Sequence, residues 1–290
     1  MSLVHIGPLQ LEVERFGPPA APAVLLIQGL GTPLTRWPLS LVQALVDAGC
    51  QVIRFDNRDV GLSSKLDDLG RPRLGALLRG EAVPVPYGLD DLAADALALL
   101  DALAITRAHV VGASMGGMVA QLLAARHPER CLSLTSIMSS SGNPALPPPT
   151  PAAQRALCAP LPESRDEAAV VEDALARQRV LMSPGYPTPE AELRAMFAAE
   201  YRRSFHPSGV ARQLAALLRG GDRRPLLARL RLPATVLHGE ADPLIPVACG
   251  RDTAAAIPGA RLRLIPGMGH DFPEALMAQF AEAILARSGS

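Results

Sequence analysis

Residues 110–117, Val110-Val111-Gly112-Ala113-Ser114-Met115-Gly116-Gly117, decide the fold of this 290-residue chain. An apolar run leads into the pattern Gly-x-Ser-x-Gly, and residues 118–125 have the composition of a helix. A strand, a tight turn and a helix in this order are typical of a nucleophile elbow, in which a serine stands at the apex of a strained turn. The residues two before and two after that serine must be small, as Gly112 and Gly116 are. We therefore predict that Ser114 is a nucleophile, and the alternative is an ordinary glycine-rich turn between a strand and a helix.

The rest of the chain alternates between apolar runs and helical patterns. Residues 23–27 are apolar throughout, which is typical of a strand buried on both faces of a parallel sheet. Further strands are expected at 3–6, 9–14, 51–55, 108–111, 131–138, 234–238 and 261–265, and helices at 36–48, 90–104 and 274–286. Residues 64–87 are expected to be irregular. The alternation predicts an α/β fold, with a mostly parallel sheet that carries helices on both faces.

Residues 141–225 have a different sequence pattern. They open with five prolines and continue with alanine-, leucine- and arginine-rich helical patterns, and no apolar strand run interrupts them. Because strands precede and follow this block, we expect an inserted helical cap at 141–225. The core is then made of residues 1–140 and 226–290.

The composition restricts the class of protein. Lysine plus arginine and aspartate plus glutamate each total 28, so the net charge is zero, and no basic run is present. This balance argues against nucleic acids and anionic membranes as partners. No apolar run is long enough for a membrane span, and no signal peptide is visible at the N-terminus. The cysteines are widely spaced, as expected for reduced thiols rather than for disulfides or a metal site: Cys50, Cys131, Cys158 and Cys249. We expect a cytoplasmic monomer or homodimer that binds a small molecule.

A serine nucleophile requires a general base, and His270 is the best placed of the six histidines. It follows the strand at 261–265 through the glycine-containing loop 266–269, and open α/β sheets bind their ligands at this edge. The other histidines are expected to be structural: His5, His109, His127, His206 and His238.

The orienting carboxylate is expected between the serine and the histidine in the chain. Asp242 lies just past the strand at 234–238, where it can accept a hydrogen bond from the histidine and fix its tautomer. Glu240 is a nearby rival, and an aspartate that only caps a turn is the structural alternative. Asp271 is a poorer candidate because it is adjacent to His270 in the chain.

Two main-chain N–H groups are expected to form an oxyanion hole. One belongs to Met115, the residue after the nucleophile. The second is expected in the glycine-rich turn after the strand at 23–27, and we choose Leu30, because Gly29 and Gly31 let the chain turn inward.

The motifs Gly-Ala-Ser114-Met-Gly-Gly, His-Gly-Glu-Ala-Asp242-Pro and Gly-Met-Gly-His270, in this order, resemble those of the α/β-hydrolase family. Within that family, residues 34–38, 55–63 and 261–270 look most like bacterial carboxylesterases and polyketide methylesterases. The resemblance implies an eight-stranded sheet, a cap after the sixth strand, and ester hydrolysis through an acyl-enzyme without a metal or organic cofactor. One departure is Gln28, where many members carry histidine.

The substrate is expected to be an uncharged, largely apolar ester of short to medium length. Most apolar residues of the 141–225 block are expected to seat the cap, but Met182 and Met196, together with Met115, are candidates to line a substrate pocket. Aspartate-dependent dehalogenases and epoxide hydrolases are excluded because position 114 is serine. A cofactor-free perhydrolase or peroxidase, an acyltransferase and a non-catalytic ligand receptor remain as alternatives.

Overall fold

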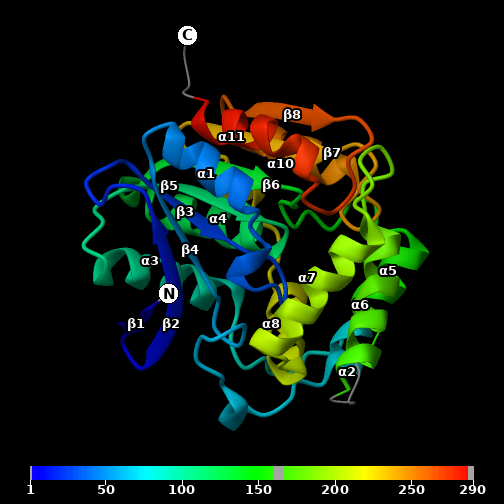
Figure 1. Ribbon diagram of the computed structural model, residues 1–290. Helices are drawn as coiled ribbons and strands as arrows, with labels where there is room; N and C mark the ends of the chain where they lie inside the picture. The colour runs from blue at the N-terminus through cyan, green and yellow to red at the C-terminus, as the bar shows by residue number, and fades with distance from the viewer. Residues whose placement is uncertain (1, 160–165, 287–290) are drawn as a thin grey trace.

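An eight-stranded sheet forms the centre of the computed structural model, which describes residues 2–159 and 166–286 (Figure 1). The strand order is β1-β2-β4-β3-β5-β6-β7-β8. The β1–β2 and β2–β4 pairs are antiparallel and every other neighbouring pair is parallel. The prediction of a mostly parallel eight-stranded sheet is therefore confirmed.

The element boundaries follow the hydrophobic pattern closely. The strands are β1 Ser2–Ile6, β2 Leu9–Phe16, β3 Ala23–Ile27, β4 Gln51–Phe55, β5 Ala108–Ala113, β6 Cys131–Ile137, β7 Ala234–Gly239 and β8 Arg261–Ile265. The helices are α1 Leu39–Asp47, α2 Leu74–Leu78, α3 Leu89–Ala102, α4 Met115–Arg126, α5 Pro151–Cys158, α6 Glu167–Leu181, α7 Glu190–Arg203, α8 Pro207–Leu218, α9 Arg224–Leu227, α10 Val247–Ala256 and α11 Met277–Leu285. Short 3-10 turns occupy 34–36, 67–69, 128–130 and 274–276.

Helices cover both faces of the sheet, as the α/β prediction requires. Successive side chains of a strand point to opposite faces. In β3, Leu25 and Ile27 accordingly pack in a core with α3 and α4, whereas Val24 and Leu26 pack in a second core with α1 and α11. The all-apolar sequence of β3 is thus explained by burial on both sides. Among the described helices, none is long and apolar enough to cross a membrane.

Two sequence-based expectations were wrong in detail. Residues 64–87 are not wholly irregular, because they contain a 3-10 turn at 67–69 and the helix α2. Helix α2 has only five residues, and it is held by packing of Ala76 and Leu77 against Ala215 of α8, a contact that local periodicity cannot reveal. The helix expected from residue 36 begins at Leu39, because a proline disfavours the helical conformation of the residue before it. Trp37 is accordingly extended, and Pro38 stands at the N-cap.

The chain between β6 and β7, residues 138–233, contains five helices and no strand in its described part. We call it the helical segment. Its residues 160–165, within the expected cap, lie outside the described residues, as do residues 287–290 of the expected core. Helix α9 crosses the expected boundary at residue 225 and packs against α4 and α10.

Buried polar contacts join the helical segment to the loops at the edge of the sheet. Arg212 of α8 is almost fully buried and donates two hydrogen bonds to Asp59, at 2.8 and 2.7 Å. Burial alone would raise the pKa of Asp59, but these bonds, together with donors from Leu66 and Tyr87, lower it. The ion pair therefore connects α8 to the loop that follows β4.

Candidate active site

The Ser114 turn joins the end of β5 to the start of α4. Ser114 has φ of 55°, a left-handed conformation that costs a non-glycine residue about 1–3 kcal/mol. The neighbouring glycines make the turn sterically feasible. A side-chain carbon on Gly116 would lie 2.1 Å from the Ile27 carbonyl oxygen, and one on Gly112 would lie 2.0 Å from the Gly116 carbonyl oxygen. The pattern Gly-x-Ser-x-Gly is therefore required by close packing of main chain against main chain.

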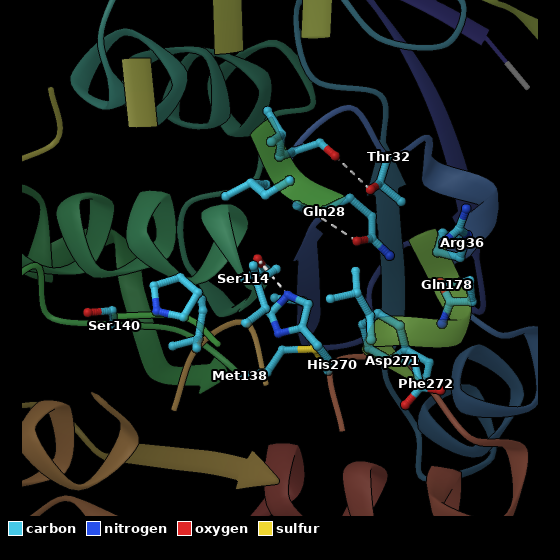
Figure 2. Close-up of a pocket in the computed structure, with 18 of the residues that line it drawn as sticks. Gln28, Thr32, Arg36, Ser114, Met138, Ser140, Gln178, His270, Asp271 and Phe272 are labelled. Atoms are coloured by element: carbon cyan, nitrogen blue, oxygen red, sulfur yellow. Dashed lines mark hydrogen bonds between the residues drawn. The ribbon is translucent and has the colours of Figure 1, made fainter. Parts of the chain in front are cut away.

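Ser114, His270 and Asp242 form a hydrogen-bonded chain. The Ser114 Oγ lies 3.0 Å from His270 Nε2, and His270 Nδ1 lies 2.7 Å from Asp242 Oδ2. The other carboxylate oxygen of Asp242 accepts the main-chain N–H groups of Leu244 and Ile245, both at 2.9 Å. Because a carboxylate accepts hydrogen bonds, this arrangement places the proton on Nδ1 and directs the Nε2 lone pair at Ser114. Figure 2 shows Ser114 and His270 facing each other at the centre of the cavity.

The rival carboxylates lie elsewhere. Glu240 is exposed, and its nearest basic partner is Arg251 at 3.8 Å. Asp271 lies beside His270 but turns to Ser183, whose N–H donates to Asp271 Oδ2 at 3.1 Å and whose hydroxyl donates to Oδ1. Burial raises the pKa of Asp271, although the bonds from Ser183 oppose this effect.

His238 is the histidine nearest to the three-residue chain, and it lies behind Asp242. Its Nε2 donates to the Ile245 carbonyl at 2.7 Å and lies 3.8 Å from Asp242 Oδ2. Burial lowers the pKa of His238, so the ring is neutral near pH 7. It therefore supports the loop that carries Asp242, in agreement with a structural role.

The His270 loop is tied to the helical segment by a group of hydrogen bonds that we call the Ser183 clamp. The N–H of His270 donates to the Leu181 carbonyl at 2.7 Å, and the N–H of Gly269 donates to Ser183 Oγ at 2.8 Å. The two bonds from Ser183 to Asp271 complete the clamp. The end of α6 thus holds the loop on both sides of the imidazole.

The residues expected to form the oxyanion hole lie beside Ser114. Met115 is the first residue of α4, so its N–H has no acceptor within the helix. Leu30 lines the same cavity as Ser114. The turn after β3 approaches Ser114 closely, because a side-chain carbon on Gly29 would lie 3.2 Å from the Ser114 Cβ. The N–H of Gly31 donates to Gln213 Oε1 of α8 at 2.8 Å, which fixes the turn that carries Leu30.

A cavity of about 660 Å³ opens over Ser114 and His270. The lining is mainly apolar and comes both from the core and from the helical segment. Its apolar residues include Met118, Met138, Leu146, Leu157, Leu181, Leu193, Met196, Leu217, Leu244 and Ile245. Met196, a candidate pocket residue in the sequence analysis, is one of these lining residues. Met182 and Met115 are not among the lining residues. Met182 packs with Val171, Leu175, Leu193 and Phe197 between α6 and α7, and Met115 is buried in the core under the sheet.

The structure adds two residues that the sequence analysis missed, Ser183 and Gln213. Ser183 lies 86 positions before Gly269, and Gln213 lies 182 positions after Gly31. Neither belongs to a motif, and hydrophobic periodicity carries no information about them. Only the folded chain reveals that they position the two loops around Ser114.

The remaining nucleophilic and metal-binding groups do not compete with Ser114. Cys249 lines the cavity, but burial raises the pKa of its thiol and keeps it protonated at neutral pH. Within residues 2–159 and 166–286, no cluster of three or more histidine, cysteine, aspartate or glutamate side chains could hold a metal ion.

Comparison with known proteins agrees with this geometry. The family model described as alpha/beta hydrolase fold matches residues 22–274. The rhodomycin D methylesterase of Streptomyces peucetius is 34% identical over 300 residues, which cover 95% of this chain and 93% of that protein. The pimeloyl-acyl-carrier-protein methyl ester esterase of Chromobacterium violaceum is 34% identical over 190 residues, which cover 64% of this chain and 70% of that protein. The crystal structure of the enol-lactonase from Burkholderia xenovorans LB400 has a TM-score of 0.74 and 26% identity, and the match covers 98% of both chains. The chain belongs to the α/β-hydrolase family.

Proposed function

We propose that this protein is a serine hydrolase that cleaves carboxylic esters through an acyl-enzyme. The observation that carries the proposal is the continuous chain of hydrogen bonds from Ser114 through His270 to Asp242 in the wall of a cavity of about 660 Å³. Relatives named as a methylesterase and a methyl ester esterase support the same reaction class.

In the first half of the reaction, Ser114 Oγ attacks the ester carbonyl carbon while His270 Nε2 takes the hydroxyl proton. Asp242 holds the imidazole in the required tautomer and stabilises the imidazolium that forms. The N–H groups of Leu30 and Met115 stabilise the negative oxygen of the tetrahedral intermediate. His270 then gives its proton to the leaving alcohol, and the acyl group remains on Ser114.

In the second half, water replaces the alcohol. His270 Nε2 takes a proton from the water as its oxygen attacks the acyl carbon, and the same two N–H groups stabilise the new intermediate. The bond to Ser114 Oγ breaks, Ser114 regains its proton from His270, and the carboxylic acid leaves. Ser114, His270 and Asp242 already lie within hydrogen-bonding distance of one another, which reduces the cost of orienting these groups.

We further propose that residues 141–225 act as a cap that selects the substrate. Gln178 and Leu181 of α6, and Leu193 and Met196 of α7, line the cavity opposite Ser114. Pockets of this size and apolar character bury most of a small organic ligand. The preferred substrates are uncharged, largely apolar methyl esters or esters of short to medium acyl chains.

Labelling with a fluorophosphonate tests the nucleophile. Mass spectrometry should find the added mass on the peptide that contains Ser114, together with complete loss of ester turnover. The Ser114→Ala variant should remain unlabelled. Labelling of another residue, or turnover by that variant, would exclude this assignment.

A panel of 4-nitrophenyl esters from acetate to palmitate, with a peptide substrate alongside, tests the substrate class. We expect a maximum at short or medium chain length and no cleavage of the peptide. A maximum at palmitate, or peptide cleavage, would exclude the proposed cap specificity. Failure to turn over any ester, despite labelling at Ser114, would instead favour a non-catalytic receptor.

A further inference from the structure

Gln28 occupies the first position after β3 and lines the catalytic cavity, although its side chain is only 2% exposed. A side-chain carbon on the next residue, Gly29, would lie 3.2 Å from the Ser114 Cβ. Gln28 therefore lies close to the proposed site of ester cleavage. The reaction described above assigns it no role.

The orientation of the Gln28 amide is fixed by its neighbours. Its Oε1 accepts the N–H of Gly29 at 2.9 Å, and its main-chain carbonyl accepts Asn57 Nδ2 at 3.0 Å. Because a main-chain N–H can only donate, the oxygen of the amide must face Gly29, and Nε2 must face the other way. Within the described part of the chain, Nε2 has no hydrogen-bond partner. A buried donor without an acceptor is unfavourable, so a bound group that supplies one is favoured here.

Thr32, Arg36 and Asp271 line the same side of the cavity as Gln28 and are already engaged with the protein, whereas the buried Asn57 Oδ1 has no partner in the described part of the chain. Figure 2 shows Gln28, Thr32, Arg36 and Asp271 on one side of the Ser114–His270 pair, with Met138 and Ser140 on the other. Thr32 Oγ1 donates to the Leu30 carbonyl at 3.0 Å, and Arg36 donates to both carboxylate oxygens of Glu200. Asp271 accepts from Ser183. The two hydrogens on Gln28 Nε2 are thus left for a ligand on this side of the cavity.

We propose that Gln28 Nε2 donates a hydrogen bond to an uncharged oxygen of the substrate, such as a ketone or ether oxygen, a few bonds from the scissile carbonyl. The proposal rests on the proposed ester hydrolysis and narrows its substrate class to esters with a second oxygen acceptor. The acceptor is uncharged, because Glu192 and Asp271 line the same cavity and repel an anion, whereas the charge of Arg36 in this lining is already balanced by Glu200. Since Nε2 is buried, a small shift of the cavity wall accompanies binding of the oxygen.

Matched ester pairs test this recognition, because each pair differs only by an oxygen. On the acid side, the 4-nitrophenyl esters of 4-oxopentanoate and 5-oxohexanoate are compared with those of pentanoate and hexanoate. On the alcohol side, 2-methoxyethyl pentanoate is compared with butyl pentanoate. The protein should prefer the oxygenated member of at least one pair by about tenfold or more in kcat/KM, since a site built for a hydrogen bond discriminates against an analogue that lacks it. The pair that responds shows on which side of the ester the acceptor lies.

Two variants separate recognition from damage to the turn. Gln28→Met removes the donor and should bring the ratio of kcat/KM within that pair close to one, whatever happens to either rate alone. Gln28→Glu, assayed at pH 8, keeps an acceptor for the Gly29 N–H but removes the donor, and it should have the same effect on the ratio. Thr32→Val disturbs the turn without touching the donor, so it should lower both rates and keep the ratio.

Equal rates within every pair for the unmodified protein would overturn the proposal, and would mean that water satisfies Nε2. A preference that survives in Gln28→Met would also overturn it. If no ester is cleaved at all, the proposed function fails and this inference fails with it, whereas cleavage of the plain esters without discrimination rejects this inference alone.

Discussion

The Ser114 turn and the His270 loop face each other across 3.0 Å, but different parts of the molecule hold them in place. The turn is fixed inside the core. Gly112 and Gly116 leave no room for a side chain between β5, α4 and the end of β3. The His270 loop is joined to the core at Met268, whose side chain is buried and whose carbonyl accepts the Ala241 N–H at 3.0 Å, but at Gly269 and His270 its main chain is held by the Ser183 clamp at the end of α6 in the helical segment.

This difference separates two kinds of substitution. A change in the core turn acts directly on Ser114, the proposed nucleophile, or on the folding of the sheet. A change in the clamp leaves the sheet intact and moves His270, the proposed base, relative to Ser114. The proposed cap therefore has two tasks, to enclose the substrate and to position His270, and variants can separate them.

Removal of the proposed nucleophile should have the largest effect. Ser114→Ala should lower kcat for a 4-nitrophenyl ester by about 10⁶-fold, because the acyl-enzyme can no longer form. Ser208→Ala, which removes an exposed hydroxyl of α8 that accepts a bond from Arg71, serves as the matched control and should retain activity. Thermal unfolding should be similar in both variants. Substantial turnover by Ser114→Ala would show that the turn does not carry the nucleophile.

Disruption of the orienting carboxylate should come next. Asp242→Asn keeps the shape but cannot hold the tautomer of His270 that accepts the serine proton, so kcat should fall by about 10⁴-fold. Glu240→Gln tests the rival carboxylate and should be close to the unmodified protein, because Glu240 is exposed. A reversed pattern, in which Glu240→Gln is crippled and Asp242→Asn is active, would reassign the acid.

The sequence predicts the core turn well because its constraints are local. A serine at the apex of a sharp turn from a strand into a helix requires small residues two positions before and after it, as the close contacts at Gly112 and Gly116 show. Apolar runs such as 23–27 reveal strands buried on both faces for an equally local reason. The fold class and the placement of Ser114 follow from these short patterns.

The clamp could not be predicted, because its constraints are not local. Ser183 is an ordinary serine after a helix, and its importance depends on a loop 86 residues away. The pocket expectation failed at Met182 for a related reason. Helical periodicity identifies an apolar face, but it does not tell which apolar residues face the cavity and which pack between two helices, as Met182 does.

Breaking the clamp should have an intermediate effect on catalysis. Ser183→Ala leaves the Gly269 N–H and the Asp271 carboxylate without their shared hydroxyl, so the His270 loop should shift. A misplacement of about 1 Å can cost on the order of 100-fold in rate, and we expect a 10- to 100-fold loss in kcat with a smaller change in KM.

Ser183→Thr restores a hydroxyl and should recover part of the rate, whereas Ser208→Ala should again be neutral. A loss confined to KM, with kcat unchanged, would show that the clamp shapes the substrate cavity rather than the position of the base.

The smallest effect concerns stability and comes from the charge inside the clamp. Burial raises the pKa of Asp271, so the folded protein holds the Asp271 proton to a higher pH than the unfolded chain does. Stability must therefore decrease as pH rises from the ordinary aspartate pKa through the raised one, because over that interval folding retains a proton that the unfolded chain has lost. Asp271→Asn does not titrate. The free energy of unfolding of the unmodified protein, measured with urea between pH 4 and 8, should thus fall relative to that of the variant as pH increases. A difference in the free energy of unfolding that is the same at every pH would reflect only the altered hydrogen bonds to Ser183. If the unmodified protein instead gains stability relative to the variant as pH increases, Ser183 stabilises the carboxylate more than burial destabilises it. The clamp would then favour the charged form of Asp271.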